Sequence, residues 1–126
     1  MTPLALLMHR EVQSVAPTTT LRAAAQLMRN KHVGSLIIGE GENSIGIVSE
    51  TDFVRKAMAD GVSPDTTYVE SIMTQPIITL DVDKTAKDAS DLMNKKGVRH
   101  LAITDMGRIV GIISMRDLVI CFKNRI

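Results

Sequence analysis

The chain has few aromatic residues, one cysteine and almost no net charge. Each of these shortages excludes some kinds of core, cross-link or binding partner. Of its 126 residues, one is tyrosine, two are phenylalanine and none is tryptophan, so the core must be aliphatic. The single cysteine, Cys121, excludes an intramolecular disulfide and suits a reducing compartment. A formal net charge of +1 gives no electrostatic argument for a nucleic-acid or membrane partner. No apolar run approaches the length of a membrane span, and the opening lacks the basic segment of a signal peptide, so we expect a cytoplasmic protein.

The chain contains one phrase twice, as GIVSETD at 46–52 and GIISMRD at 111–117. Sliding the sequence by 65 positions aligns 44 pairs of residues without a gap (12–55 against 77–120), and 13 of these pairs are identical. A unit of this length is too long for the common solenoid repeats. The sequence therefore predicts two copies of one unit, related by a pseudo-two-fold axis.

Each copy shows the pattern of a strand, a helix, a hairpin and a second helix. Apolar or small residues at i, i+3, i+4 and i+7 from Leu21 and from Ala86 predict the first helices. Their N-caps are expected in the Thr18–Thr20 run and at Asp83. The turn-rich segments GEGENS and TDMGR join apolar runs, as in hairpins. The predicted elements are strands Gln13–Val15, Leu36–Ile38 and Ile45–Val48 with helix Ser49–Ala59, and strands Ile77–Leu80, Leu101–Ile103 and Ile109–Ile113 with helix Ser114–Phe122. Core positions are expected for Met28, Met58 and Met93, and residues 60–76 are expected to connect the copies.

The repeated Ser-x-x-Asp has a structural and a functional interpretation. In the structural one it is a capping box, in which Ser49 accepts from the amide three residues on and Asp52 stabilises the first turn. Gly46 and Gly111 would then mark bulges or close packing. In the functional one, the Asp accepts from both hydroxyls of a ribose, the Ser binds a sugar or phosphate oxygen, and the helix N-terminus favours anions. The two interpretations are compatible.

The order strand-helix-hairpin-helix, closed twice by G-h-h-[ST]-x-x-D, resembles a tandem pair of cystathionine-β-synthase (CBS) domains, together called a Bateman module. The resemblance covers residues 4–122 and implies a stand-alone, bacterial-type protein. The implied fold class is α/β (α+β), with two β-α-β-β-α repeats packed as a pseudo-two-fold pair. Repeat 1 is predicted at 4–60, the linker into the second copy at 61–76, and repeat 2 at 77–126.

The resemblance also implies two nucleotide clefts, each combining residues of both copies. In cleft 1, Asp52 is expected on the ribose, and Arg99 and His100 can neutralise phosphate. Cleft 2 has only Arg116 as a cation, so the sequence favours cleft 1. The residues predicted for cleft 1 are Ser49, Thr51, Asp52, Thr74, Ile78, Val98, Arg99 and His100. Those predicted for cleft 2 are Val33, Gly34, Ser35, Ile112, Ser114, Arg116 and Asp117.

Several kinds of site find no support in the sequence. GEGENS lacks the third glycine of a dinucleotide fingerprint and joins two strands instead of opening a helix. The histidines His9, His32 and His100 lie far apart in sequence, so we expect no metal site. No Ser-His-Asp arrangement can be assembled, and we expect that the protein is not an enzyme.

We therefore predict a regulatory, energy- or metabolite-sensing protein that requires no cofactor and binds an adenine nucleotide or adenosyl compound. The candidate ligands are AMP, ADP, ATP, NAD and S-adenosylmethionine, and binding would change the conformation seen by an unidentified partner protein. A homodimer through the second helices is expected, because Val119, Ile120 and Phe122 would otherwise leave an apolar patch. The alternative is a protein–protein scaffold with empty clefts, in which Ser-x-x-Asp only caps helices.

Overall fold

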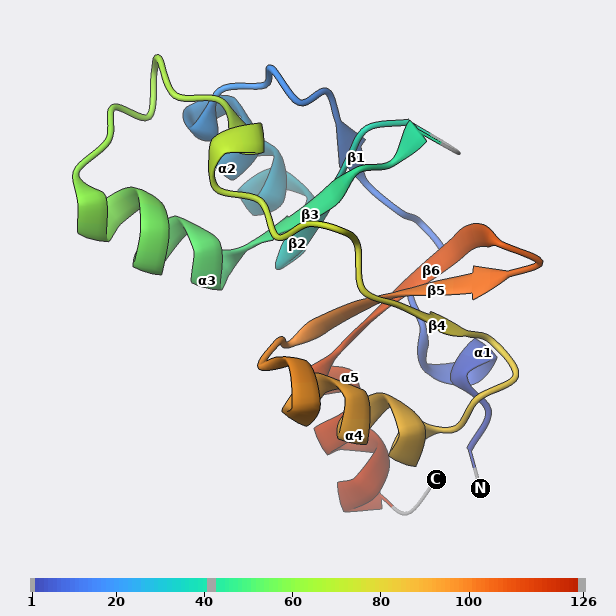
Figure 1. Cartoon of the computed structure of the whole chain (residues 1–126). Helices are drawn as coiled ribbons and strands as arrows, with labels where there is room; N and C mark the ends of the chain where they lie inside the picture. Colours follow the sequence, from blue (N-terminus) through green and yellow to red (C-terminus); the bar gives the residue numbers. More distant parts are fainter. Residues whose placement is uncertain (1, 41–42, 125–126) are drawn as a thin grey trace. The chain divides into compact units, whose positions relative to one another are not determined.

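The computed structural model describes residues 2–40 and 43–124, and Figure 1 shows the elements along the chain. These elements form two compact units. The first-repeat unit consists of residues 13–77, and the second-repeat unit consists of residues 1–12 together with 78–126. The N-terminal segment therefore belongs to the unit of the second copy, although it precedes the first copy in sequence.

The first-repeat unit is built on a three-stranded sheet in the order β1-β2-β3. Its β1 runs parallel to β2, and β2 pairs antiparallel with β3. All four residues of β2 are buried, so the centre of the sheet is apolar on both faces. The elements are β1 (Ser14–Val15), α2 (Leu21–Lys31), β2 (Ser35–Ile38), β3 (Gly46–Ser49), α3 (Glu50–Asp52), the π-helix η2 (Phe53–Met58) and the 3₁₀-helix η3 (Val69–Ser71).

The second-repeat unit has the same topology, with the sheet order β4-β5-β6, a parallel first pair and an antiparallel second pair. Its elements are α1 (Leu4–Leu7), β4 (Thr79–Asp81), α4 (Ala86–Lys96), β5 (His100–Asp105), β6 (Arg108–Ser114) and α5 (Met115–Asn124). The bounds of α2 and α4 differ by the 65 positions of the sequence repeat at both ends. The predicted fold class is confirmed, and the strand ends differ from the predicted ones by at most two residues. Two residues of the predicted GEGENS turn, Gly41 and Glu42, lie outside the described residues.

Threonine begins both long helices. The Thr20 hydroxyl accepts from the amide of Ala23 at 3.2 Å, which confirms the cap expected in the Thr18–Thr20 run. The Thr85 hydroxyl accepts from the Asp88 amide at 3.2 Å, and the Thr85 amide donates to the Asp88 carboxylate at 3.0 Å. The prediction of Asp83 as the second cap is wrong, because a cap must directly precede the first helical residue, here Ala86.

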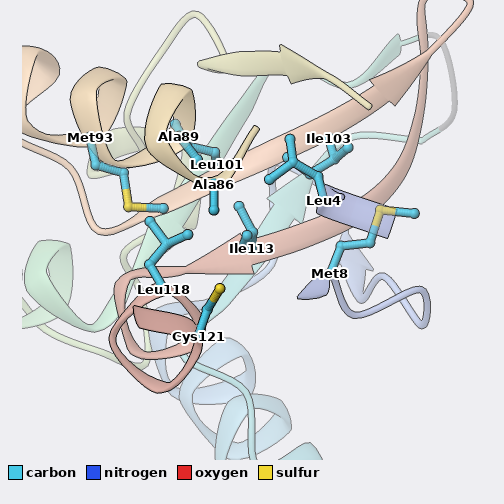
Figure 2. Packing of buried hydrophobic residues seen from close by; sticks show 10 residues of the cluster. All are labelled: Leu4, Met8, Ala86, Ala89, Met93, Leu101, Ile103, Ile113, Leu118 and Cys121. Atoms are coloured by element: carbon cyan, nitrogen blue, oxygen red, sulfur yellow. The ribbon is translucent and has the colours of Figure 1, made fainter. Parts of the chain in front are cut away.

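Each core includes a short helical segment that the sequence did not predict. In the second-repeat unit, Leu4 and Met8 from the N-terminal segment pack with the sheet and with α4 and α5 (Figure 2). In the first-repeat unit, Val69 and Ile72 occupy the corresponding place, and Val69 lies 65 positions after Leu4. The stretch predicted as a plain connection, 60–76, therefore ends in a structured segment, because its apolar side chains complete the core.

The helix predicted at Ser49–Ala59 is confirmed as an unbroken helical stretch over residues 50–60, but its hydrogen-bonding pattern changes along its length. Its first turn, α3, is α-helical and continues as the π-helix η2. Phe53 and Ala57 turn toward the core, whereas Met58 is 78% exposed. The prediction of Met58 as a core residue is wrong, because the residue after Ala57 lies on the outer face of this turn. Met28 and Met93 are buried as predicted.

Candidate ligand sites at the two Ser-x-x-Asp phrases

Both phrases lie where an antiparallel strand ends and a helix begins. Ser49 closes β3 and Ser114 closes β6, so each Asp falls in the first turn of the following helix. The side chain of Asp52 is 7% exposed and that of Asp117 is 14% exposed. Burial of a carboxylate is unfavourable unless hydrogen bonds or an ion pair replace its contacts with water.

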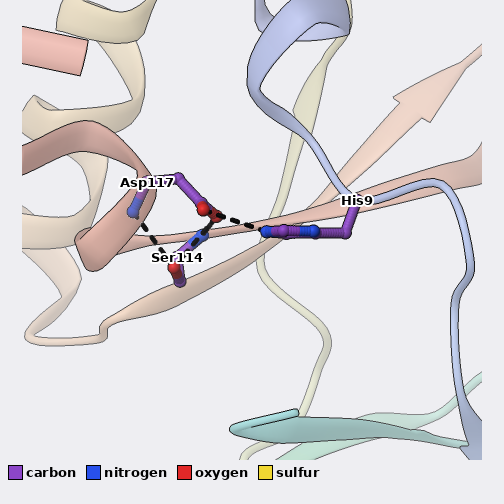
Figure 3. A network of polar contacts seen from close by, with 3 residues as sticks. All are labelled: His9, Ser114 and Asp117. Carbon is purple, nitrogen blue, oxygen red and sulfur yellow. Dashed lines mark hydrogen bonds and ion pairs between the residues drawn. The ribbon is translucent and has the colours of Figure 1, made fainter. Parts of the chain in front are cut away.

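Asp117 is held by its own phrase and by the N-terminal segment (Figure 3). Its Oδ2 accepts from the Ser114 amide at 2.8 Å and from the Ser114 hydroxyl at 2.9 Å. The Asp117 amide donates back to Ser114 Oγ at 3.2 Å, so the capping interpretation is confirmed here. Its Oδ1 lies 2.9 Å from Nε2 of His9, whose side chain is 70% exposed.

Asp52 has the same cap but different outer partners. Its Oδ2 accepts from the Ser49 amide at 2.9 Å and from the Ser49 hydroxyl at 3.3 Å. Its Oδ1 lies 3.0 Å from the Lys56 ammonium and accepts from the Thr74 hydroxyl at 3.5 Å. Lys56 also donates to the carbonyl of Ile72 at 2.9 Å, so this cation links the helix to the segment beside it.

Short backbone bridges bring His9 and Thr74 to the two carboxylates. His9 exchanges backbone hydrogen bonds with Ile112 at 2.9 and 3.0 Å. Thr74 exchanges the equivalent bonds with Ile47 at 2.8 and 3.0 Å. The two bridging residues are themselves 65 positions apart.

The glycine that begins each phrase permits these bridges. A Cβ at Gly46 would lie 2.6 Å from the sulfur of Met73, and a Cβ at Gly111 would lie 2.6 Å from the sulfur of Met8. Real Cβ atoms do not approach so closely, so both glycines are sites of close packing, as one interpretation of the sequence held. The space beside each glycine is filled by the chain's own methionine.

Within each unit the structure assembles part of each predicted cleft. It brings Asp52 together with Ser49 and Thr74, and Asp117 together with Ser114. The predicted residue Ile112 is bridged to His9, which was not predicted. Thr51 is half-buried and Arg116 is exposed, and neither makes one of the hydrogen bonds that hold the carboxylates.

The strand starts lie beside the phrases of their own units. The Gly34 carbonyl accepts from the Glu50 amide at 3.1 Å, and Ser35 pairs with Ser49. The Arg99 carbonyl accepts from the Met115 amide at 2.8 Å, and His100 pairs with Ser114. Three predicted cleft residues also pack against hydrophobic cores; they are Val33, Ile78 and Val98. The predicted clefts each combine residues of both units, and those combined sets stay predictions.

Sequence reasoning missed two residues that contact the carboxylates, His9 and Lys56. The 65-residue offset that pairs His9 with Thr74 was available in the sequence, and it marks His9 as the counterpart of a predicted site residue. Lys56 follows Asp52 by four residues, a spacing that places opposite charges on one helical face.

Two further properties of the described residues bear on the kind of site. Across residues 2–40 and 43–124, no three His, Cys, Asp or Glu side chains are grouped as metal ligands. In the same part of the chain, every helix is too short or too polar to cross a membrane.

The duplicated sheet-and-helix unit with its Ser-x-x-Asp phrase defines a class, and comparison with known proteins gives the same one. The CBS domain family model matches residues 5–59 and 69–124. The chain belongs to the CBS-domain family and carries a tandem pair of these domains, which confirms the resemblance seen in the sequence.

Proteins similar to the chain include uncharacterized ones and one that forms a hexamer. An uncharacterized protein of Methanopyrus kandleri is 38% identical over 113 residues, which are 88% of this chain and 58% of that relative, so the chain spans less than two thirds of its length. An uncharacterized conserved protein from Pyrococcus horikoshii has a similar structure, with a TM-score of 0.88, 28% identity, and coverage of 99% of this chain and 95% of that one. A hexameric CBS-CP12 protein from bloom-forming cyanobacteria gives a TM-score of 0.85 at 25% identity, over 94% of this chain and 71% of that one.

Proposed function

We propose that the chain is a regulatory protein that binds an adenine nucleotide or adenosyl compound and transmits binding to a partner protein. One observation carries the proposal: an Asp carboxylate fixed by a backbone amide and a Ser hydroxyl at a strand-to-helix junction, present in both units. CBS domains in general bind adenosyl ligands, which supports the choice of ligand class.

A carboxylate held in this way suits a ribose. Hydrogen bonds from hydroxyls to a charged acceptor are stronger than those between neutral groups. The two bonds from the Ser fix the orientation of each carboxylate before any ligand arrives, so little ordering is required on binding. A nucleotide with its ribose diol intact is therefore favoured over a deoxynucleotide.

The proposed output is a change of conformation or association and not a chemical step. A ligand shifts an equilibrium only as far as it binds one state better than the other. A regulatory role of this kind requires no catalytic residue. The partner is proposed to be a protein.

The test is thermal unfolding of the purified protein with AMP, ADP, ATP, NAD or S-adenosylmethionine, each at about 1 mM. A compound with a dissociation constant of roughly 10 μM adds on the order of 2.7 kcal/mol to the free energy of unfolding by mass action, which gives a clear rise in Tm. We expect a rise for one or two compounds and a smaller one for the matching 2′-deoxynucleotide. Unchanged Tm values with all five compounds would reject the ligand class.

A second function, as a protein interaction module, is favoured by apolar side chains left in solvent. On α5, Val119, Ile120 and Phe122 are 55%, 46% and 51% exposed, and on η2, Val54 and Met58 are 63% and 78% exposed. Exposed apolar patches mark interaction surfaces. We propose that α5 takes part in a homo-oligomer. Size-exclusion chromatography with light scattering tests this by measuring the molar mass of the protein in solution. Phe122→Ser should lower that molar mass, and a monomeric wild-type protein at about 100 μM would contradict the proposal.

A further inference from the structure

The two Ser-x-x-Asp sites are equivalent in sequence but not in their partners. The residue four positions after Asp52 is Lys56, whereas the residue four positions after Asp117 is the buried Cys121. The bridging residue is a threonine at one site and His9 at the other. These differences decide which carboxylate can accept a ligand.

Asp52 is occupied on both oxygens. Its cap uses Oδ2, while Oδ1 is held by the Lys56 ammonium at 3.0 Å and the Thr74 hydroxyl at 3.5 Å. Lys56 is fixed in turn by the Ile72 carbonyl. Lys56 is 45% exposed and Asp52 is 7% exposed, so the pair is half-buried. A ribose would have to displace both this doubly held cation and the Thr74 hydroxyl from Oδ1.

Asp117 presents one oxygen outward. Its cap also uses Oδ2, but among the described residues Oδ1 pairs with a single imidazole, and this imidazole is 70% exposed. Because the imidazole of this pair lies largely in water, a ligand can share or replace its hydrogen bond at little cost. Imidazole nitrogens donate or accept according to tautomer, so His9 can serve either role toward a hydroxyl.

The position of His9 is fixed by its backbone and not by the pair alone. Two hydrogen bonds join it to Ile112, and the preceding Met8 is buried against Gly111. Figure 3 shows the ring directed at Asp117 from the N-terminal segment. The exposed ring therefore stays beside Oδ1 when a ligand enters.

We propose that Asp117 and His9 together form the ribose site of this chain, and that Asp52 takes no ligand. One hydroxyl of the diol donates to Asp117 Oδ1, and the other hydrogen-bonds to Nε2 of His9. This inference rests on the proposed function and reverses the preference for Asp52 that was predicted from the sequence. It predicts one ligand per chain.

Titration calorimetry of paired variants tests the proposal, using whichever of the five adenine compounds raises Tm most. Asp117→Asn is the sharpest variant: its amide oxygen can keep the bonds from Ser114, which places an NH₂ donor where the diol requires an acceptor. We expect it to weaken binding roughly tenfold or more, since hydrogen bonds to charged groups are strong. The matched change Asp52→Asn should leave affinity within about twofold.

The second pair compares the bridging residues. His9→Ala should weaken binding roughly fivefold or more, with partial recovery in His9→Gln, which restores a donor and an acceptor. The matched variant Thr74→Ala should leave the affinity for the ligand unchanged. His9 is largely exposed, so its loss should not unfold the protein, and circular dichroism checks this.

The remaining outcomes show whether the inference alone fails or the proposed function fails with it. Loss of binding in Asp52→Asn with normal binding in Asp117→Asn, or two ligands per chain, would overturn the inference and leave the proposed function intact. Normal binding in His9→Ala would remove His9 from the site. Absence of binding by the wild-type protein for all five compounds would overturn both.

Discussion

Replacing Leu4 by alanine tests whether the N-terminal segment completes the core of the second-repeat unit. Leu4 is fully buried and belongs to the same hydrophobic cluster as Leu101, Ile113 and Leu118 (Figure 2). Leu→Ala changes in protein cores lower the free energy of unfolding by about 2–5 kcal/mol, because the lost methyl groups leave a cavity. We expect about 3 kcal/mol for Leu4→Ala, a large part of the 5–15 kcal/mol that typically stabilises a domain.

Urea unfolding followed by circular dichroism measures this change. With a slope of about 2 kcal/mol per M, a loss of about 3 kcal/mol lowers the midpoint by roughly 1.5 M. The matched control is Leu6→Ala in the same short helix, because the Leu6 side chain is 75% exposed. The control removes the same atoms from the same segment, so it should change stability by less than about 0.5 kcal/mol.

The comparison can refute the reasoning directly. If Leu4→Ala and Leu6→Ala give the same small change, the segment does not pack into the core. The backbone bridge that holds His9 beside Asp117 would then lose its support, because Leu4 and His9 belong to the same N-terminal segment. A large loss in Leu6→Ala would instead contradict the assignment of its face to solvent.

Three smaller predictions follow from other contacts. Gly111→Ala should lower the free energy of unfolding by about 1–3 kcal/mol, because the new Cβ meets the Met8 sulfur, and Tm measurement should find no loss if that contact is absent. Thr20→Ala removes a helix cap and should cost about 1 kcal/mol in urea unfolding, whereas no change would mean that the hydroxyl does not cap the helix. The hydrogen bond from Arg22 lowers the pKa of Asp65, so this pair stabilises the fold above the unfolded-state pKa and the benefit disappears as pH falls through the lower folded-state pKa. Asp65→Asn should therefore lower Tm at pH values above the unfolded-state pKa, and its difference from wild type should shrink as pH falls below that pKa. A difference in Tm that does not change with pH would contradict the assignment.

Much of the fold could be predicted from the sequence because the relevant interactions are local. The apolar spacing that begins at Leu21 and Ala86 marks two helices whose faces repeat every 3.6 residues. The Ser-x-x-Asp phrases form hydrogen bonds across three residues, so their caps follow from spacing alone. Two assignments were wrong by a residue or two: the second cap is Thr85 and not Asp83, and Ala57 and not Met58 faces the core.

Other features could not be predicted, since they depend on contacts between distant segments. The sequence repeat shows that residues near Leu4 and near Val69 are equivalent, but it does not show which core each segment completes. The structure places the N-terminal segment with the second copy, where its apolar side chains are buried.

The sequence by itself determined the duplication, the order of elements in each copy, the family and the two carboxylates. These properties are encoded in composition and in spacings of a few residues, which local hydrogen bonds and helix periodicity convert into structure. The tertiary structure alone decided the partners that reach those carboxylates from other segments: Thr74 at Asp52, and His9 at Asp117. His9 and Asp117 are 108 positions apart, and only burial of Met8 against Gly111 and the backbone bridge to Ile112 bring them within 2.9 Å.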